Sequence, residues 1–133
     1  MSHQVHTNTI SARRIVGVFL SGDVSEVDAL IDPTYHDHQG LAGVALHGQA
    51  GFRQVVASAR AALPNLHVTI DDLIAEGDKV VMRLRWRSRI TTSTTIERET
   101  IEILRFADGR AVEHWGAEAW AREYRPDDRA EEE

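Results

Sequence analysis

Glu102 is the acidic residue whose neighbours in the sequence point most clearly to chemistry. It lies in the stretch 96–106, which has the composition of a β-strand, and alternation puts it on the same strand face as Leu104 and Phe106. An ionised carboxylate on an apolar face is costly unless it is paired or faces a cavity. We therefore interpret Glu102 as a candidate acid or base in a pocket. A register shifted by one residue, which would place Glu102 in solvent, is the alternative.

A pair of histidines raises the question of a metal site. His36 and His38 are two residues apart and share one side of a strand if that strand is regular. Such a pair can bind a metal ion, but no third ligand stands at a supporting spacing, so we expect no metal site. The simpler interpretation is one histidine in a pocket or core and one at the surface. The chain has no cysteine, which excludes thiolate zinc sites, iron–sulfur clusters and cysteine nucleophiles.

The elements that must position these residues come in a simple order, with helices first and strands afterwards. Helical spacing of apolar residues predicts helices over residues 9–20, 24–31 and 49–63. Residues 35–38 are expected to be extended, and strands are predicted over 66–74, 79–90, 96–106 and 110–121. This order predicts an α+β fold in which the N-terminal helices pack on one face of a curved antiparallel sheet.

The dipeptide Asp-Gly at 108–109 is the strongest hairpin signal in the chain. A two-residue turn there places Glu102 opposite Trp115 in the flanking strands. The sheet face toward the helices then collects Val80, Met82, Leu84, Trp86, Leu104, Phe106, Trp115 and Ala117. We predict that four of these side chains line one substrate-binding pocket: Trp86, Trp115, Met82 and Leu104.

The opposite sheet face carries mixed charges together with more apolar side chains than a solvent-exposed face needs. Its expected members are Arg83, Arg85, Arg87, Arg89, Glu97, Glu99, Glu118, Ile101, Ile103, Val112 and His114. Opposite charges in neighbouring strands stabilise such a face by a few tenths to about 1 kcal/mol per pair. We predict that part of this face forms a homodimer interface.

The charge balance limits the classes of partner. The 133 residues carry 15 Lys and Arg against 21 Asp and Glu, and residues 127–133 hold five of these acids against one arginine. Residues 1–126 are therefore nearly neutral and have no basic cluster, which argues against nucleic-acid binding. We expect a single domain over residues 1–126 and a disordered acidic tail over residues 127–133.

The location of the protein is predicted from two further features. The apolar run at 15–20 is too short to span a membrane and has no secretory cleavage pattern behind it. We expect no membrane association. The absence of cysteine agrees with a cytoplasmic location.

Several short motifs are spread over most of the chain. They are Tyr35-His36-Asp37-His38 before a glycine loop, Gly48 at the start of the third helix, Leu63-Pro64-Asn65-Leu66, the stretch 74–83 around Glu76-Gly77-Asp78, and the stretch 105–115 that ends in His114-Trp115. Together these motifs resemble those of the SnoaL-like polyketide cyclases, which have the NTF2-like cone-shaped fold. The fold hosts many chemistries, so the resemblance is weaker on the reaction than on the architecture.

The resemblance implies a deep pocket between helices and sheet, acid–base chemistry, and no metal or organic cofactor. It carries two residues over from the family pattern, His38 as the histidine of the early strand and Trp115 as the tryptophan of the last strand. The usual catalytic Asp, four residues after that tryptophan, is Ala119 here. The acid is then expected from the neighbouring Glu118, turned inward by a bulge, or from Glu102.

The sequence therefore predicts a cofactor-free tailoring enzyme of the cyclase type that acts on a small, apolar, aromatic substrate. Its candidate catalytic residues are Glu118, Glu102 and His38. One alternative is a polyketide ring hydroxylase or an epoxide hydrolase on the same fold. An alternative of another class, favoured by Ala119, is a non-catalytic module that binds a small molecule.

Overall fold

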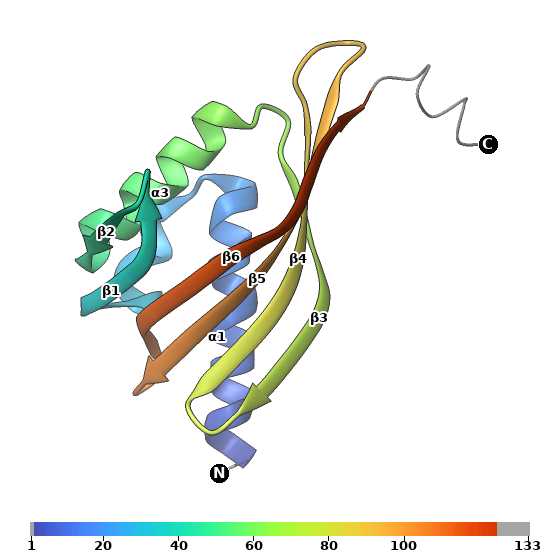
Figure 1. Ribbon diagram of the computed structural model, residues 1–133. Helices are drawn as coiled ribbons and strands as arrows, with labels where there is room; N and C mark the ends of the chain where they lie inside the picture. The colour runs from blue at the N-terminus through green and yellow to red at the C-terminus, as the bar shows by residue number, and fades with distance from the viewer. Residues whose placement is uncertain (1, 125–133) are drawn as a thin grey trace.

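The computed structural model describes residues 2–124, and the predicted acidic tail at 127–133 lies outside these described residues (Figure 1). Its helical elements are α1 (Ser2–Ser21), the 3₁₀ turn η1 (Val24–Glu26), α2 (Val27–Leu30) and α3 (Gly48–Ala62). Its strands are β1 (Ile31–Leu41), β2 (Val44–His47), β3 (His67–Glu76), β4 (Lys79–Arg89), β5 (Thr95–Ala107) and β6 (Arg110–Tyr124). The predicted order of helices and strands is confirmed, with β2 as an additional strand.

The strands form one curved sheet in the order β2-β1-β6-β5-β4-β3, and helices α1 and α3 cover one of its faces (Figure 1). The four neighbours in the meander are antiparallel, as predicted, whereas β1 runs parallel to β6. The extended segment expected at 35–38 is therefore the middle of a longer strand that lies inside the sheet. The α+β plan is confirmed, with one parallel pair where a purely antiparallel sheet was expected.

The core lies between the helices and the inner face of the sheet. Alternation along β4 and β5 turns six side chains toward the helices as predicted: Val80, Met82, Leu84, Trp86, Leu104 and Phe106. Helix α1 contributes Ile15 and Val18, and α3 contributes Phe52 and Val56. Full burial of a side chain of this size stabilises a fold by about 1.5–3 kcal/mol, so this layer holds helices and sheet together.

The β5–β6 hairpin departs from the predicted register one residue beyond its turn. Phe106 pairs with Ala111 as expected, but Arg105 then pairs with Glu113, which leaves Val112 as an extra residue in β6. A bulge of this kind moves the residues that follow it, as far as the next irregularity, to the other face. The predicted pairing of Glu102 with Trp115 is therefore wrong, and Glu102 pairs with Gly116.

The bulge exchanges the two predicted faces of β6. His114, expected on the charged face, turns inward opposite Leu104, while Trp115 turns outward opposite Ile103. Glu118, opposite Thr100, is also on the inner side, and Ala117 is on the outer side. Val112 itself is buried rather than exposed on the outer face. A second irregularity at Ala119 follows, because Thr100 pairs with Glu118 and Glu99 pairs with Trp120.

Candidate active site

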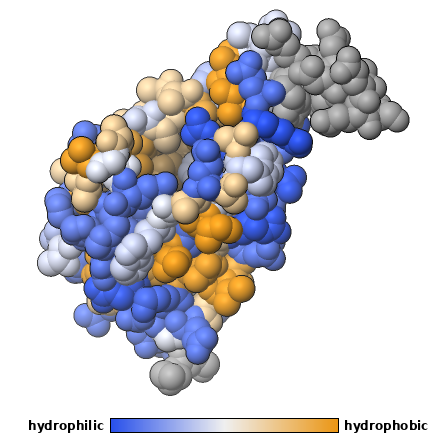
Figure 2. Space-filling model, viewed as in Figure 1, coloured by the Kyte–Doolittle hydropathy of each residue, from blue (hydrophilic) through white to orange (hydrophobic). Residues whose placement is uncertain are grey.

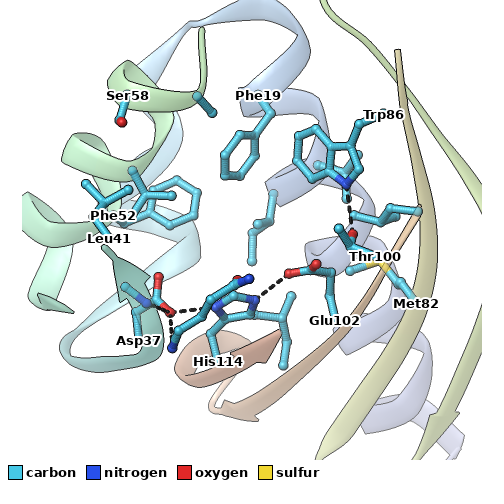
Figure 3. A pocket seen from close by; sticks show the side chains of 18 of the residues that line it. Phe19, Asp37, Leu41, Phe52, Ser58, Met82, Trp86, Thr100, Glu102 and His114 are labelled. Carbon is cyan, nitrogen blue, oxygen red and sulfur yellow. Dashed lines mark hydrogen bonds and ion pairs between the residues drawn. The ribbon is translucent and has the colours of Figure 1, made fainter. Parts of the chain in front are cut away.

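A cavity of about 310 Å³ opens between α1, α3 and the inner face of the sheet (Figure 3). Most of its wall is apolar, with Phe19 from α1, Phe52 from α3, and Met82 and Trp86 from β4. Polar lining residues converge from β1, β5 and β6: Asp37, Gln39, Arg98, Thr100, Glu102, His114 and Glu118. An apolar cavity with a few placed polar groups is the usual form of a small-molecule site.

The aromatic part of the wall is held by edge-to-face contacts. The ring centroid of Phe19 is 5.7 Å from that of Phe52 and 5.5 Å from that of Trp86, with interplanar angles of 76° and 87°. The indole Nε1 of Trp86 donates a hydrogen bond of 2.8 Å to Thr100 Oγ1. These contacts fix the indole plane and provide a preformed surface for a flat apolar ligand.

His114 lies between two carboxylates at the wall of this cavity (Figure 3). Its Nδ1 is 2.7 Å from Asp37 Oδ1, and its Nε2 is 2.6 Å from Glu102 Oε1. We call Asp37, His114 and Glu102 the acid–histidine–acid triad. The parallel pairing of β1 with β6 sets Asp37 directly opposite His114, and the β6 bulge turns His114 inward toward Glu102 of β5.

The charges of the triad follow from its contacts. Burial disfavours the imidazolium, but hydrogen bonds to Asp37 and Glu102 and their negative charges outweigh it and raise the pKa of His114 to about 9. Burial also opposes ionisation of Asp37, yet the His114 contact and the backbone N–H groups of Gly40 and Gln39 hold the pKa of Asp37 below its usual value. At neutral pH, His114 is therefore positively charged and Asp37 is negatively charged.

Gly116 leaves room for the triad. A Cβ at this position would lie 2.8 Å from Glu102 Oε1 and would also overlap the side-chain oxygen of Gln39. Real Cβ atoms do not approach so closely, so any larger residue would displace the Glu102 carboxylate from His114. The geometry of the site therefore depends on a glycine at position 116.

The predicted site residues fall into two groups. Glu102, Trp86, Met82 and Leu104 line the cavity together. Glu118 also lines it, but at a more open place, with its side chain 50% exposed and its Oε2 3.7 Å from Arg98 Nε.

His38 and Trp115 lie on the other face of the sheet, away from the cavity. Alternation along β1 buries Tyr35 and Asp37 and exposes His38, whose Nε2 is 2.8 Å from Glu113 Oε2. The rings of His38 and Trp115 stack with centroids 4.9 Å apart and an interplanar angle of 8°. The expected position of Trp115 in the pocket is wrong because of the β6 bulge, and the expected pocket position of His38 is wrong because Asp37 takes the inward position.

Two functional candidates, Asp37 and His114, were missed by the sequence reasoning. Both stand in motifs that were singled out, Tyr35-His36-Asp37-His38 and the stretch that ends in His114-Trp115. The sequence did contain a signal for His114, since a single histidine in a strand that also carries apolar residues can face a pocket as well as solvent. The assumed regular hairpin turned it outward.

The described residues offer neither a metal cluster nor a membrane-spanning helix. Within residues 2–124, no group of three or more histidine, cysteine, aspartate or glutamate side chains is arranged to hold a metal ion. None of the helices in this part of the chain combines the length and the hydropathy that crossing a bilayer would require.

Comparison with known proteins identifies the architecture. A family model described as SnoaL-like polyketide cyclase matches residues 9–119. A candidate polyketide cyclase from Bacillus cereus ATCC 10987 is 26% identical, with a TM-score of 0.76 over 85% of this chain and 74% of that chain. IdmH from Streptomyces antibioticus, also a candidate polyketide cyclase, is 28% identical, with a TM-score of 0.74 over 84% of this chain and 91% of that chain.

A further structure supports the fold alone. An NTF2-like protein of unknown function from Mesorhizobium loti is 21% identical, with a TM-score of 0.72 over 88% of this chain and 94% of that chain. No curated protein matches the chain. The predicted NTF2-like cone is confirmed by these structures.

Proposed function

The chain belongs to the family of SnoaL-like polyketide cyclases, and from this premise we propose that it closes a ring in a flat, aromatic, polyketide-like substrate by acid–base chemistry. The observation that carries the proposal is the position of His114, charged and fixed between Asp37 and Glu102, at the wall of an apolar cavity. A group that can take up and release a proton, beside an apolar wall suited to aromatic rings, supports acid–base chemistry on such a substrate.

Glu102 is the proposed proton carrier. Its carboxylate removes a proton from a carbon flanked by carbonyl groups, and the resulting enolate carbon attacks a second carbonyl carbon of the same substrate. The proton then passes from Glu102 to the alkoxide oxygen that this attack creates. One C–C bond forms, one carbonyl becomes a hydroxyl, and no net proton or electron is consumed, so one carboxylate serves as base and then as acid.

His114 and Asp37 are proposed as positioning residues. An imidazolium 2.6 Å from Glu102 offsets the cost of a negative charge in a buried position and holds the carboxylate in one orientation. Asp37, which accepts hydrogen bonds from the backbone N–H groups of Gln39 and Gly40, fixes the imidazole ring. The apolar wall excludes water and orients the substrate.

Replacement of the carboxylate tests the proposal. We expect Glu102→Gln to lower kcat on a linear or partly cyclised aromatic polyketide by a hundredfold or more, roughly the worth of a general base. Glu99→Gln is the matched control, because Glu99 stands on the same strand but faces outward and pairs with Arg83. Full turnover by a folded Glu102→Gln variant would overturn the proposal.

The two other candidate catalytic residues predicted from the sequence receive no proton-transfer role in this proposal. His38 lies outside the cavity, and Glu118 is half exposed at its edge, where water competes for the proton. If Glu118→Gln abolished turnover while Glu102→Gln did not, the proton carrier would be Glu118 instead. Both variants therefore belong in the same assay.

Opening of an epoxide is the second candidate function. The triad could orient a water molecule through Glu102, because a carboxylate held by a charged histidine can accept a proton from water. Reaction in H₂¹⁸O separates the two chemistries, since epoxide opening adds a labelled hydroxyl group and aldol closure does not. Tight binding of polycyclic aromatic compounds without conversion would favour a non-catalytic binding module.

We also propose that the protein is a homodimer through the outer face of the sheet. Register places Ile74, Val81, Ile103 and Trp115 in one row across β3, β4, β5 and β6, and Ile74 is 66% exposed. Figure 2 shows the apolar patch that lies over the lower part of β4 and β5. An apolar row on a charged sheet face is typical of an interface between proteins.

A further inference from the structure

A second polar group lines the cavity at a distance from the triad. Arg98 of β5 lies four residues before Glu102 on the same strand face, which corresponds to about 13 Å in an extended strand. Arg98 pairs across the sheet with Trp86 of β4, and its guanidinium Nε lies 3.7 Å from Glu118 Oε2 of β6 on the other side. The cavity therefore has two polar ends, and between them on this strand face stands Thr100, whose hydroxyl already accepts the hydrogen bond from Trp86 Nε1.

Arg98 is weakly held. Among the described residues that line the cavity, it is the only lysine or arginine. Its ion pair with Glu118 spans 3.7 Å, longer than a hydrogen bond, and the two side chains are 40% and 50% exposed. Exposed pairs of this kind contribute little to stability, so an incoming anion can replace Glu118 at low cost.

The two ends of the cavity differ in charge. The triad end holds the carboxyl groups of Asp37 and Glu102 around the single imidazole of His114, so acidic groups outnumber basic ones there. An anionic group on a ligand is repelled from that end and attracted to the Arg98 end. A flat ligand with one anionic substituent would thus enter in a single orientation, with its uncharged end at Glu102.

We infer that the ligand is an aromatic carboxylic acid and that Arg98 binds its carboxylate. Without a ligand, Glu118 is the ion-pair partner of Arg98. Arginine suits this task because its planar guanidinium can donate two parallel hydrogen bonds to one carboxylate. The inference deepens the proposed function by naming the substrate class, and it rests on that function only where the ligand is called a substrate. Arg98 would then select the orientation in which the reacting carbon meets Glu102.

The test compares two probes with the same ring system, anthraquinone-2-carboxylate and its methyl ester, which differ in charge and by one methyl group. Their affinities are measured by isothermal titration calorimetry at low and moderate salt. We expect the wild-type protein to bind the acid about tenfold more tightly than the ester, with a smaller difference at higher salt. Arg98→Gln should remove this preference and leave the affinity for the ester unchanged.

Two further variants complete the experiment. Glu118→Gln removes the competing carboxylate and should strengthen binding of the acid by a few fold. Arg85→Gln is the control, because Arg85 is exposed on the outer face and pairs with Asp71, so both affinities should stay as in the wild type. The wild-type preference and the Glu118→Gln result remain informative even if Arg98→Gln does not fold.

Several outcomes would overturn the inference. The first is equal affinity of the wild-type protein for acid and ester, and the second is no binding of the acid. The third is an Arg98→Gln variant that loses affinity for both probes to the same extent. The proposed function fails on a different result, full turnover by Glu102→Gln. Because the probes report binding and do not react, the two failures are distinguishable.

Discussion

Asp37 and His114 lie directly opposite each other across the parallel strands β1 and β6, with Asp37 Oδ1 and His114 Nδ1 2.7 Å apart. They are 77 positions apart in the chain. The contact depends on the only parallel strand pair among the described residues. Asp37 holds the Nδ1 side of the imidazole, and Glu102 holds the Nε2 side. The ring is therefore held at both ends by acids that come from different strands.

Asp37→Asn tests the anchor of the triad. The variant keeps the size of the side chain but removes the charge that stabilises the imidazolium, so the pKa of His114 should fall from about 9 toward its ordinary value. Breaking a buried charged pair costs about 3–5 kcal/mol of folding free energy. Urea unfolding and NMR titration of the histidine ring measure the two effects. An unchanged ring titration would show that Asp37 does not hold the charge on His114.

Stability should depend on pH through His114. Its pKa is raised from 6.5 to about 9 in the folded protein, so its contribution is complete below about pH 6.5 and is lost as the pH rises through 9. The loss should be on the order of 3 kcal/mol. At the acid end, the lowered pKa of Asp37 gives a contribution that is present above its ordinary value of 3.8 and is lost as the pH falls below it.

Urea unfolding at pH 6 and pH 10 measures the alkaline loss. His114→Gln is the control, because it removes the group that loses its proton and should flatten this part of the profile. Equal alkaline losses in the wild type and in His114→Gln would contradict the prediction.

Gly116→Ala should affect the rate more than the fold. The added Cβ would come within 2.8 Å of Glu102 Oε1 in the unaltered geometry, so the carboxylate must move away from His114. We expect kcat to fall at least tenfold, since a misplaced catalytic group loses its alignment with the substrate. Gly17→Ala is the matched control, because a Cβ at that position meets nothing within 4 Å. Unchanged kcat in Gly116→Ala would mean that Glu102 tolerates displacement.

Trp86→Phe tests the aromatic wall. Phe keeps a ring near Phe19 but cannot donate to Thr100 Oγ1, a buried hydroxyl that would lose its partner. The expected cost is about 1–3 kcal/mol of stability together with a raised KM, because the wall is then less well fixed. Thermal unfolding and steady-state kinetics report the two quantities. A KM equal to that of the wild type would place the substrate away from Trp86.

The proposed dimer is tested by Ile103→Lys. Ile103 lies in the middle of the apolar row on the outer sheet face, so a charge there should convert the dimer into a monomer in light scattering. Val44→Lys is the control, because Val44 is 64% exposed but belongs to β2, away from the row. A wild-type protein that scatters as a monomer at high concentration and moderate salt would exclude the dimer.

Much of the candidate site could be predicted because its residues obey local rules. Alternation is a property of the extended backbone, so Met82 and Trp86 share one face of β4 and Glu102 and Leu104 share one face of β5. The register between β4 and β5 puts both sets on the same side of the sheet. The same rule correctly assigned Glu102 to the apolar side. The faces of β6 and of β1 were misjudged.

The sequence by itself determined the order of helices and strands, the apolar inner face of the sheet and the presence of a carboxylate on that face, since each depends on the spacing of neighbouring residues. The tertiary structure decided which side of β6 faces the cavity, because one extra residue at Val112 reverses the alternation. No pattern in the sequence of the strand predicts this bulge. It also decided the partners of His114, because the parallel contact of β1 with β6 joins segments far apart in the chain. Local propensity cannot specify such a contact, which forms only when the whole sheet is assembled.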